Sequence, residues 1–169
     1  MIKTSFLFLV LVSLLSCSLD KNIHTKKTLN KLPYKWDIDG QIAIKANNEY
    51  KSGSFNWRQE YDDFNFTLTA PLALSSFEIR KNDSNLYVNN KAINLNFKDW
   101  MLKEYGWFLP TKHLAKVIFL TNGKLENEWN VKYITYKIIQ GFKVAKKITL
   151  TNLKKNIELK LNVYNLKFK

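Results

Sequence analysis

Cysteine, histidine, arginine, glycine and proline are all scarce in this sequence of 169 residues. The single cysteine, Cys17, excludes an internal disulfide and a cysteine-based zinc site. The two histidines, His24 and His113, are far apart, and the spacing of metal ligands is absent around them. The sequence also lacks a Gly-x-Ser-x-Gly segment and a glycine-rich phosphate loop. We therefore expect no catalytic residues, no metal and no cofactor, and hence a protein that is not an enzyme.

Acidic residues are outnumbered almost two to one, with 14 Asp plus Glu against 27 Lys plus Arg, for a net charge of +13. Only Arg58 and Arg80 are arginines. Proteins that recognise nucleic acid favour arginine, whose guanidinium makes bidentate contacts, so this lysine-rich charge does not indicate nucleic-acid binding. Two interpretations stay open: a solvated lysine surface, or attraction to anionic lipid headgroups or an acidic partner.

The longest apolar run, residues 6–15, is too short to span a bilayer. Lys3 precedes it and Ser16 follows it, directly before Cys17. A positive start, an apolar stretch and a small residue before the cleavage point are typical of a secretory signal peptide. The segment Leu14 to Cys17 resembles the lipobox of bacterial lipoproteins. We therefore predict that residues 1–16 are a signal peptide and that Cys17 carries the lipid.

A lipidated cysteine fixes the expected location of the chain. Bacterial lipoproteins carry two or three acyl chains, and each buried methylene contributes about 0.8 kcal/mol, so the anchor is permanent. The residue after Cys17 is Ser18, whereas Asp at this place is associated with retention at the inner membrane in enterobacteria. We expect attachment to the cell outer membrane, facing the periplasm. Polar residues 17–35 read as the lipidated N-terminus and a flexible tether, and residues 36–169 as one domain.

Alternation of apolar and polar residues with period two dominates this domain and predicts half-buried strands. It occurs in residues 38–45, 54–58, 64–70, 77–80, 86–88, 93–95, 129–133, 148–150 and 157–163. Asn89-Asn90 fits a tight turn between two of these segments. We count about nine to eleven antiparallel strands, which is too many for a flat sheet in a small domain. The predicted fold is mainly β, a curled antiparallel sheet or incomplete barrel.

Helical spacing appears only in the middle of the domain. Asn96 can cap a helix that has Asp99 in its first turn and that ends at Gly106. Its apolar face is formed by Phe97, Trp100, Met101 and Tyr105. Thr111 can cap a second helix, which ends near Gly123 and carries Leu114, Val117 and Ile118. We expect two or three short helices to cover one opening of the sheet as a lid.

Two polar features in this region have an ordinary structural interpretation. His113 is offset from the apolar residues of the second helix, so a surface histidine is expected. The acidic pair Asp62-Asp63 follows Tyr61 between two predicted strands, where such residues favour a hairpin turn. Neither feature indicates a catalytic site.

The residues expected to face the interior are unusually aromatic. Aromatic side chains at such positions form either an ordinary core or the wall of a ligand cavity, and the sequence pattern alone does not separate the two. The candidates for a cavity wall that holds acyl chains are Phe55, Trp57, Phe64, Phe66, Leu68, Phe77, Trp100 and Met101.

Four short segments, in this order, carry a resemblance to a known family. They are Gly40 to Ala43, Ser54 to Gln59, Leu68 with Pro71-Leu72, and Gly106 to Pro110 with Leu114. From Trp36 to Phe168 the chain resembles LolB, the family of outer-membrane receptors for lipoproteins. The resemblance implies an incomplete antiparallel barrel with a hydrophobic cavity under a helical lid. It also implies a monomer that takes lipoproteins, by their acyl chains, from a soluble LolA-like periplasmic carrier and delivers them to outer-membrane phospholipid.

The resemblance assigns a role to one loop, and the chain differs from the family pattern at two places. Pro71 and Leu72 match a family loop that projects a leucine toward the membrane, whereas packing of Leu72 onto the barrel rim is the alternative. The family has glycine where this chain has Ala73, and alanine is less free to take a positive φ. After Leu114 the family's tryptophan and Gly-x-Pro turn are missing. Other functions that stay open are binding of a different hydrophobic ligand and a structural role with a filled barrel.

Overall fold

The computed structural model of the chain describes residues 28–46, 48–108, 111–121, 125 and 129–169. Cys17 and the predicted signal peptide lie outside these residues. Among the helices of the described part, none has the length and apolar character needed to cross a bilayer.

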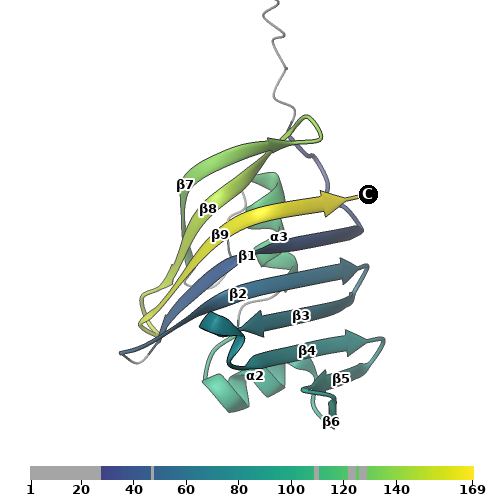
Figure 1. Ribbon diagram of the computed structural model, residues 1–169, viewed down its shortest axis with the longest axis vertical. Coiled ribbons are helices and arrows are strands. Elements are labelled where there is room, and N and C mark those ends of the chain that lie inside the picture. Colours follow the sequence, from purple (N-terminus) through teal and green to yellow (C-terminus); the bar gives the residue numbers. More distant parts are fainter. Residues whose placement is uncertain (1–27, 47, 109–110, 122–124, 126–128) are drawn as a thin grey trace, which may run out of the picture.

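Nine strands form one antiparallel sheet. They are β1 (Lys35–Ala46), β2 (Glu49–Glu60), β3 (Asp63–Thr69), β4 (Ser76–Asn82), β5 (Asn85–Val88), β6 (Lys91–Ile93), β7 (Trp129–Ile139), β8 (Phe142–Asn152) and β9 (Ile157–Phe168). Their order in the sheet is β6-β5-β4-β3-β2-β1-β9-β8-β7, so the last strand pairs with the first and the two edges stay apart. Figure 1 shows the resulting open, curled sheet. The predicted incomplete barrel is confirmed as a sheet that does not close.

Alternating burial along the strands defines an inner and an outer face of the sheet. On β2, Phe55 and Trp57 are buried, whereas Ser54, Asn56 and Arg58 are exposed. The pairing register keeps each face continuous from strand to strand, because Phe55 lies opposite Leu68 of β3. Burial of one face is therefore what holds the register, since a slip by one residue would expose every apolar side chain.

Two glycines allow the strands to approach closely where the sheet curls. A Cβ atom on Gly40 of β1 would overlap the carbonyl oxygen of Asn162 on β9, and one on Gly53 of β2 would overlap that of Thr69. Next to Gly40, the register of β9 shifts, leaving Tyr164 as an extra residue. Such a bulge increases local twist and bends the strand. The curl of the sheet thus depends on small residues at defined places.

The described residues form two α-helices, α2 (Phe97–Tyr105) and α3 (Thr111–Leu120), which lie on the same face of the sheet, as Figure 1 shows. The cap of α2 is as predicted: Asp99 donates its backbone N–H to Asn96 Oδ1 over 2.9 Å. Gly106 ends α2 with a φ of 72°. Thr111 is itself the first residue of α3, and not the capping residue before it. A polar residue is also tolerated there, because the first turn has free backbone N–H groups. Gly123, the predicted end of the second helix, lies outside the described residues.

Each helix covers its own part of the inner face with aromatic contacts. Under α3, the Phe119 ring lies 5.7 Å from Trp36 and 5.6 Å from Phe168, measured between ring centroids. Under α2, the ring of Phe97 lies 5.1 Å from Phe64. Phe119 is completely buried, although it was not among the residues predicted for the apolar face of α3. The lid predicted from helical spacing is therefore fixed to the sheet by ring packing.

The turns expected from sequence are present. Asn89 and Asn90 connect β5 and β6 with φ values of 48° and 63°, as a type I′ hairpin turn requires. Tyr61 and Asp62 join β2 to β3, and Tyr61 has a φ of 54°. This hairpin turn lies one residue earlier than the predicted Asp62-Asp63, since Asp63 begins β3. The described end of the predicted tether contacts the domain, since the Tyr34 ring stacks on Tyr61 at 5.3 Å. The chain therefore contacts the turn between β2 and β3 just before β1 begins.

Candidate functional site

Five of the eight predicted cavity residues are part of the packed core. Each of them has a relative exposure of 9% or less. They are Phe55, Trp57, Phe64, Trp100 and Met101. Trp57, for example, contacts Trp36 at 4.6 Å and Phe66 at 6.3 Å between ring centroids. At these positions, neighbouring side chains already cover the inner surface.

The other three candidates, Phe66, Leu68 and Phe77, are only partly buried. Leu68 lies opposite Phe77 in the pairing of β3 with β4. Ile42 and Ile44 of β1 are inner-face residues that are also partly buried. We call these five residues the inner apolar strip. Apolar surface left half covered between a sheet and its helices is the kind of surface that a flexible hydrophobic ligand can occupy.

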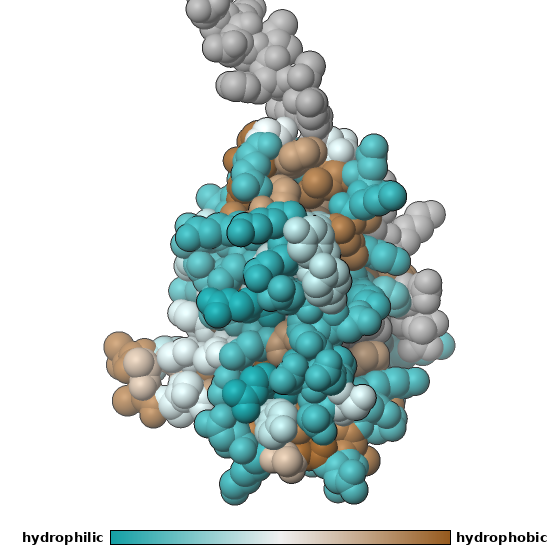
Figure 2. All heavy atoms as spheres, turned by 90° about the vertical axis from the view of Figure 1, so that its right-hand side faces the viewer, coloured by the Kyte–Doolittle hydropathy of each residue, from teal (hydrophilic) through white to brown (hydrophobic). Residues whose placement is uncertain are grey.

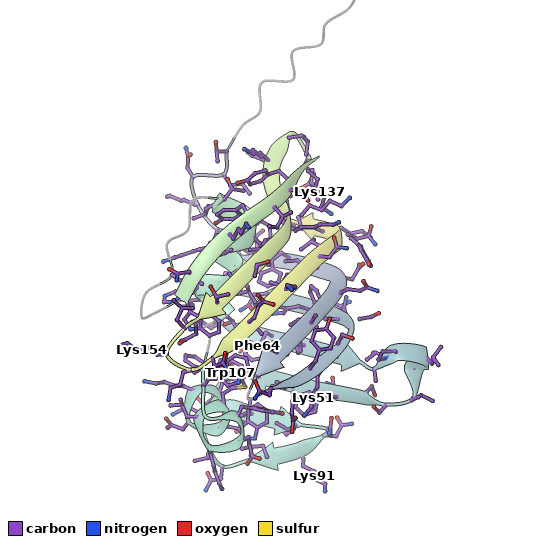
Figure 3. The ribbon with its side chains drawn as sticks, turned by 90° about the vertical axis from the view of Figure 1, so that its left-hand side faces the viewer. Lys51, Phe64, Lys91, Trp107, Lys137 and Lys154 are labelled. Carbon is purple, nitrogen blue, oxygen red and sulfur yellow. The ribbon has the colours of Figure 1, made fainter. Side chains whose placement is uncertain are left out.

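The rim near the inner apolar strip carries a charged residue and a phenol. Lys51 of β2 is largely exposed and forms an ion pair with Glu49 at 3.2 Å. Burial raises the pKa of Tyr105 on α2, Glu104 adds to this rise, and Lys51 opposes it. Figure 3 shows Lys51 in the lower half of the molecule, between Lys137 and Lys91. The apolar strip therefore ends at a polar rim.

The connection between β3 and β4 projects two leucines into solvent. It contains a short 3-10 turn, η2 (Pro71–Ala73), and Leu72 and Leu74 are 90% and 81% exposed. Figure 2 shows a hydrophobic group standing out from the body of the molecule on this connection. Exposed leucines in a short loop favour an interaction with a partner or membrane, because nothing in the fold requires them there. The alternative in which Leu72 packs onto the barrel rim does not match this exposure.

The backbone of this connection holds the leucines outward. Ala70 donates its N–H to the Ser75 carbonyl oxygen over 2.9 Å and closes the loop. Leu72 and Ala73 have φ values of 60° and 53°, in the left-handed region that non-glycine residues avoid. Ala73 thus takes a positive φ although it replaces the family glycine. Strain of this kind at consecutive residues is typical of functional loops.

Other candidates from sequence occupy ordinary positions. His113 on α3 is half buried, and no group of three or more possible metal ligands occurs among the described residues. Asp62 forms an ion pair with Lys112 at 2.7 Å, which lowers the pKa of Asp62. The turn between β2 and β3 is thereby linked to α3. Leu74 is exposed as well, as expected for a second leucine in a short connection between strands.

Comparisons with known proteins identify the family of this chain. The family model described as "Outer membrane lipoprotein LolB" matches residues 34–165. An outer-membrane lipoprotein LolB of Francisella tularensis subsp. tularensis (strain FSC 198) is 30% identical, covering 90% of this chain and 87% of the relative. A LolB of Nitrosococcus oceani is 24% identical over 78% of this chain and 76% of the relative.

Among solved structures, a LolA superfamily protein from Nitrosomonas europaea aligns with a TM-score of 0.51 and 9% identity, covering 80% of this chain and 86% of that chain. This similarity concerns the fold, an antiparallel sheet with helices on one face. Together with the family match over most of the described domain, these findings show that the chain belongs to the LolB family of outer-membrane lipoproteins.

Proposed function

We propose that the protein accepts lipoproteins from a soluble LolA-like carrier in the periplasm and delivers them to the inner leaflet of the outer membrane. The observation that carries this proposal is the projecting loop with Leu72, beside a sheet whose inner face keeps a half-covered apolar strip. A monomer is sufficient, because sheet, helices and loop all belong to one chain. The proposed role is transfer without chemical change of the cargo.

The physical need for such a protein follows from the cargo. An acyl chain of about sixteen carbons would cost on the order of 10 kcal/mol to expose to water, at about 0.8 kcal/mol per methylene. The chain must therefore pass from one apolar surface to another. Because the transfer is driven by differences in affinity, the bilayer serves as the final and most favourable location.

The first experiment changes the loop. Leu72→Glu places a charge where an apolar side chain contributes about 1.5 to 3 kcal/mol on entering the bilayer. Since Leu72 is 90% exposed, folding and uptake from a loaded carrier should be unchanged. Release into vesicles should slow by at least about tenfold, the equivalent of 1.4 kcal/mol. The measurement is the rate at which a labelled lipoprotein moves from carrier to protein and then to vesicles.

Leu153→Glu is the matched control, because Leu153 is also exposed, at 78%, and lies on the turn between β8 and β9. A release rate for Leu72→Glu equal to that of wild type would leave the loop without a membrane role. If both variants slowed release into vesicles equally, the effect would come from any exposed leucine and not from this loop.

The second experiment changes the inner apolar strip. Leu68→Glu would place an unpaired charge among the acyl chains, which is costly, so loading from the carrier should fall. Thr67→Glu is the control, since Thr67 is the neighbouring residue on the outer face of the same strand. Both variants must unfold cooperatively before loading is compared. Normal loading of a folded Leu68→Glu protein would exclude this wall as the acyl site.

The anchor is tested separately. Cys17→Ala should give a protein without acyl mass, whereas wild type should carry it on Cys17, as measured by mass spectrometry of the membrane fraction. Absence of acyl mass on the wild-type cysteine would contradict the proposed anchor and the expected attachment to the periplasmic side of the outer membrane.

A further inference from the structure

The outer face of the sheet carries a groove next to the projecting loop. Its volume is about 560 Å³, within the range of small-molecule sites. Pro71, the residue before Leu72, forms part of its wall, as do Tyr50 and Ile134. The groove is therefore continuous with the loop that projects the leucines. Its polar side chains belong to the outer face of the sheet, and Ile42 of the inner apolar strip also borders it.

The strand register explains why the floor of the groove is polar and why short side chains leave space above it. One row across the sheet runs from Lys147 of β8 through Asn162 and Gln41 to Ser54 of β2. The next row contains Thr149, Lys160, Ala43 and Ser52. Alanine and serine on β1 and β2 are short, whereas both lysines lie on β8 and β9. The floor thus consists of small side chains and hydrogen-bond donors, with two ammonium groups on one side.

The charge of the groove is positive. Lys147 and Lys160 are diagonal neighbours, a relation in which side chains of paired strands lie about 7 to 8 Å apart. Lys160 is partly neutralised by Glu158, at 2.9 Å, but Lys147 has no ion-pair partner among the described residues. No carboxylate from the described part of the chain lines the groove. Lys147 is therefore the main cation available to an anion in this groove.

Asn162 provides a second indication of a ligand. Asn162 is one of the residues that line the groove, and its Oδ1 is buried without a hydrogen-bond partner in the described part of the chain. An unsatisfied buried acceptor is costly unless a ligand or water donates to it. Phospholipid headgroups supply both partners, since the phosphate accepts from lysine while the ammonium or hydroxyl group beyond it donates.

We propose that this groove binds the phosphate-containing headgroup of a membrane phospholipid when Leu72 and Leu74 enter the bilayer. The inference rests on the proposed membrane role of the loop. Entry of two leucines brings the wall at Pro71, and with it Lys147, to the level of the headgroups. The apolar loop and the groove then hold the protein in one orientation, with the loop in the acyl region and the lysines at the phosphates.

The test measures binding of residues 17–169 with Cys17→Ala to phosphatidylcholine vesicles, with and without phosphatidylglycerol. Lys147→Gln should weaken binding to the phosphatidylglycerol vesicles about fivefold, the effect of one lysine at an anionic surface. The same change at Lys91 is the control, because Lys91 belongs to the edge strand β6 at the far end of the sheet from β8. Lys91→Gln should leave binding unchanged within about twofold.

A variant that fills the groove without changing its charge distinguishes binding in the groove from attraction to a positively charged surface. Ala43→Leu fills the floor and should weaken binding to the same vesicles while thermal unfolding stays cooperative. If Lys147→Gln and Lys91→Gln had equal effects, or if Ala43→Leu had none, the groove would not be a headgroup site. If either of these outcomes occurred and Leu72→Glu still lost binding to the vesicles, the headgroup site would be rejected and the proposed membrane role of the loop would stand. Unchanged binding of Leu72→Glu would instead contradict the function on which the inference rests.

Discussion

The region under α3 and the connection between β3 and β4 are both rich in apolar residues, yet they end in opposite environments. Phe119 of α3 is completely buried between Trp36 and Phe168. Leu72 of the connection is 90% exposed. The first belongs to a helix with a sheet to pack against, and the second to a short loop whose own backbone turns it outward. Hydrophobicity therefore decides that a residue needs a partner, and the backbone decides whether the fold supplies one.

This difference suggests a division of labour. Mutation of a residue in the packed core should lower the stability of the protein and leave its interaction with membranes unchanged. Mutation of a loop leucine should leave the stability unchanged and weaken the interaction with membranes. Four measurements of the free energy of unfolding would break or sharpen this contrast.

The largest expected effect is on the packed side. Phe119→Ala removes a ring that contacts two aromatic neighbours and leaves a cavity, so unfolding should become easier by about 3 to 5 kcal/mol. Leu72→Ala should change the same quantity by less than about 0.5 kcal/mol, as surface substitutions do. Chemical denaturation of both variants measures the difference. Similar losses for the two would show that Leu72 is part of the core.

The second prediction concerns the curl of the sheet. Gly40→Val would drive a Cβ into the carbonyl oxygen of Asn162, so β1 and β9 must separate, at a cost of about 1 to 3 kcal/mol. Ala43→Val, on the outer face of the same strand, should be nearly neutral because valine suits a strand. A Gly40→Val protein as stable as wild type would mean that the close approach is not needed for the fold.

The third prediction concerns strain in the loop. Ala73 has a φ of 53°, which costs an L-residue roughly 1 to 2 kcal/mol, whereas glycine loses roughly 0.5 to 1 kcal/mol through greater freedom in the unfolded chain. Ala73→Gly should therefore stabilise the protein by about 0.5 to 1 kcal/mol. Ala92→Gly in strand β6 has no such strain to relieve and should destabilise it. Thermal unfolding that moved both variants in the same direction would contradict the strained loop.

The smallest effect is expected for the ion pair between Asp62 and Lys112. Both side chains are largely exposed, so Lys112→Ala should cost less than about 0.5 kcal/mol. Lys112 lowers the pKa of Asp62 from 3.8, so the stabilisation is present at neutral pH and is lost as pH falls through the folded pKa. The difference between wild type and variant should thus disappear in acid. A difference that persisted there would require a contact other than the ion pair.

Local features of the fold were predictable because they depend on neighbours in sequence. Asn96, Asp99 and Gly106 define α2 through hydrogen bonds within a few residues. Asn89-Asn90 specifies a turn because asparagine tolerates a positive φ. By contrast, β7 extends to Ile139 and β8 begins at Phe142, well beyond the segments 129–133 and 148–150 predicted by alternation. Irregular register near Ile134 shifts the alternation there, so the period-two pattern fails.

The candidate site was predictable in part. Periodicity placed all six strand residues among the eight candidates on the inner face, but it did not separate those completely covered, such as Trp57, from those half covered, such as Leu68. That distinction depends on where α2 and α3 lie over the sheet. The groove on the outer face was not predicted, because Lys147, Asn162 and Gln41 come together only when β9 pairs with both β8 and β1.

The sequence by itself determined which residues alternate, where the helices and tight turns begin, and, through its N-terminal pattern, the expectation of a lipid anchor at Cys17. These depend on interactions over a few residues, such as capping hydrogen bonds and the alternation of side chains along a strand. Only the tertiary structure decided that the last strand joins the first, bringing Asn165 within 2.9 Å of Asp39, measured from Nδ2 to Oδ2. It also decided which aromatic rings are buried and which leucines remain exposed to solvent. The physical reason is that alternation states which side chains share a face, whereas pairing between distant strands and coverage by helices depend on the packing of the whole chain.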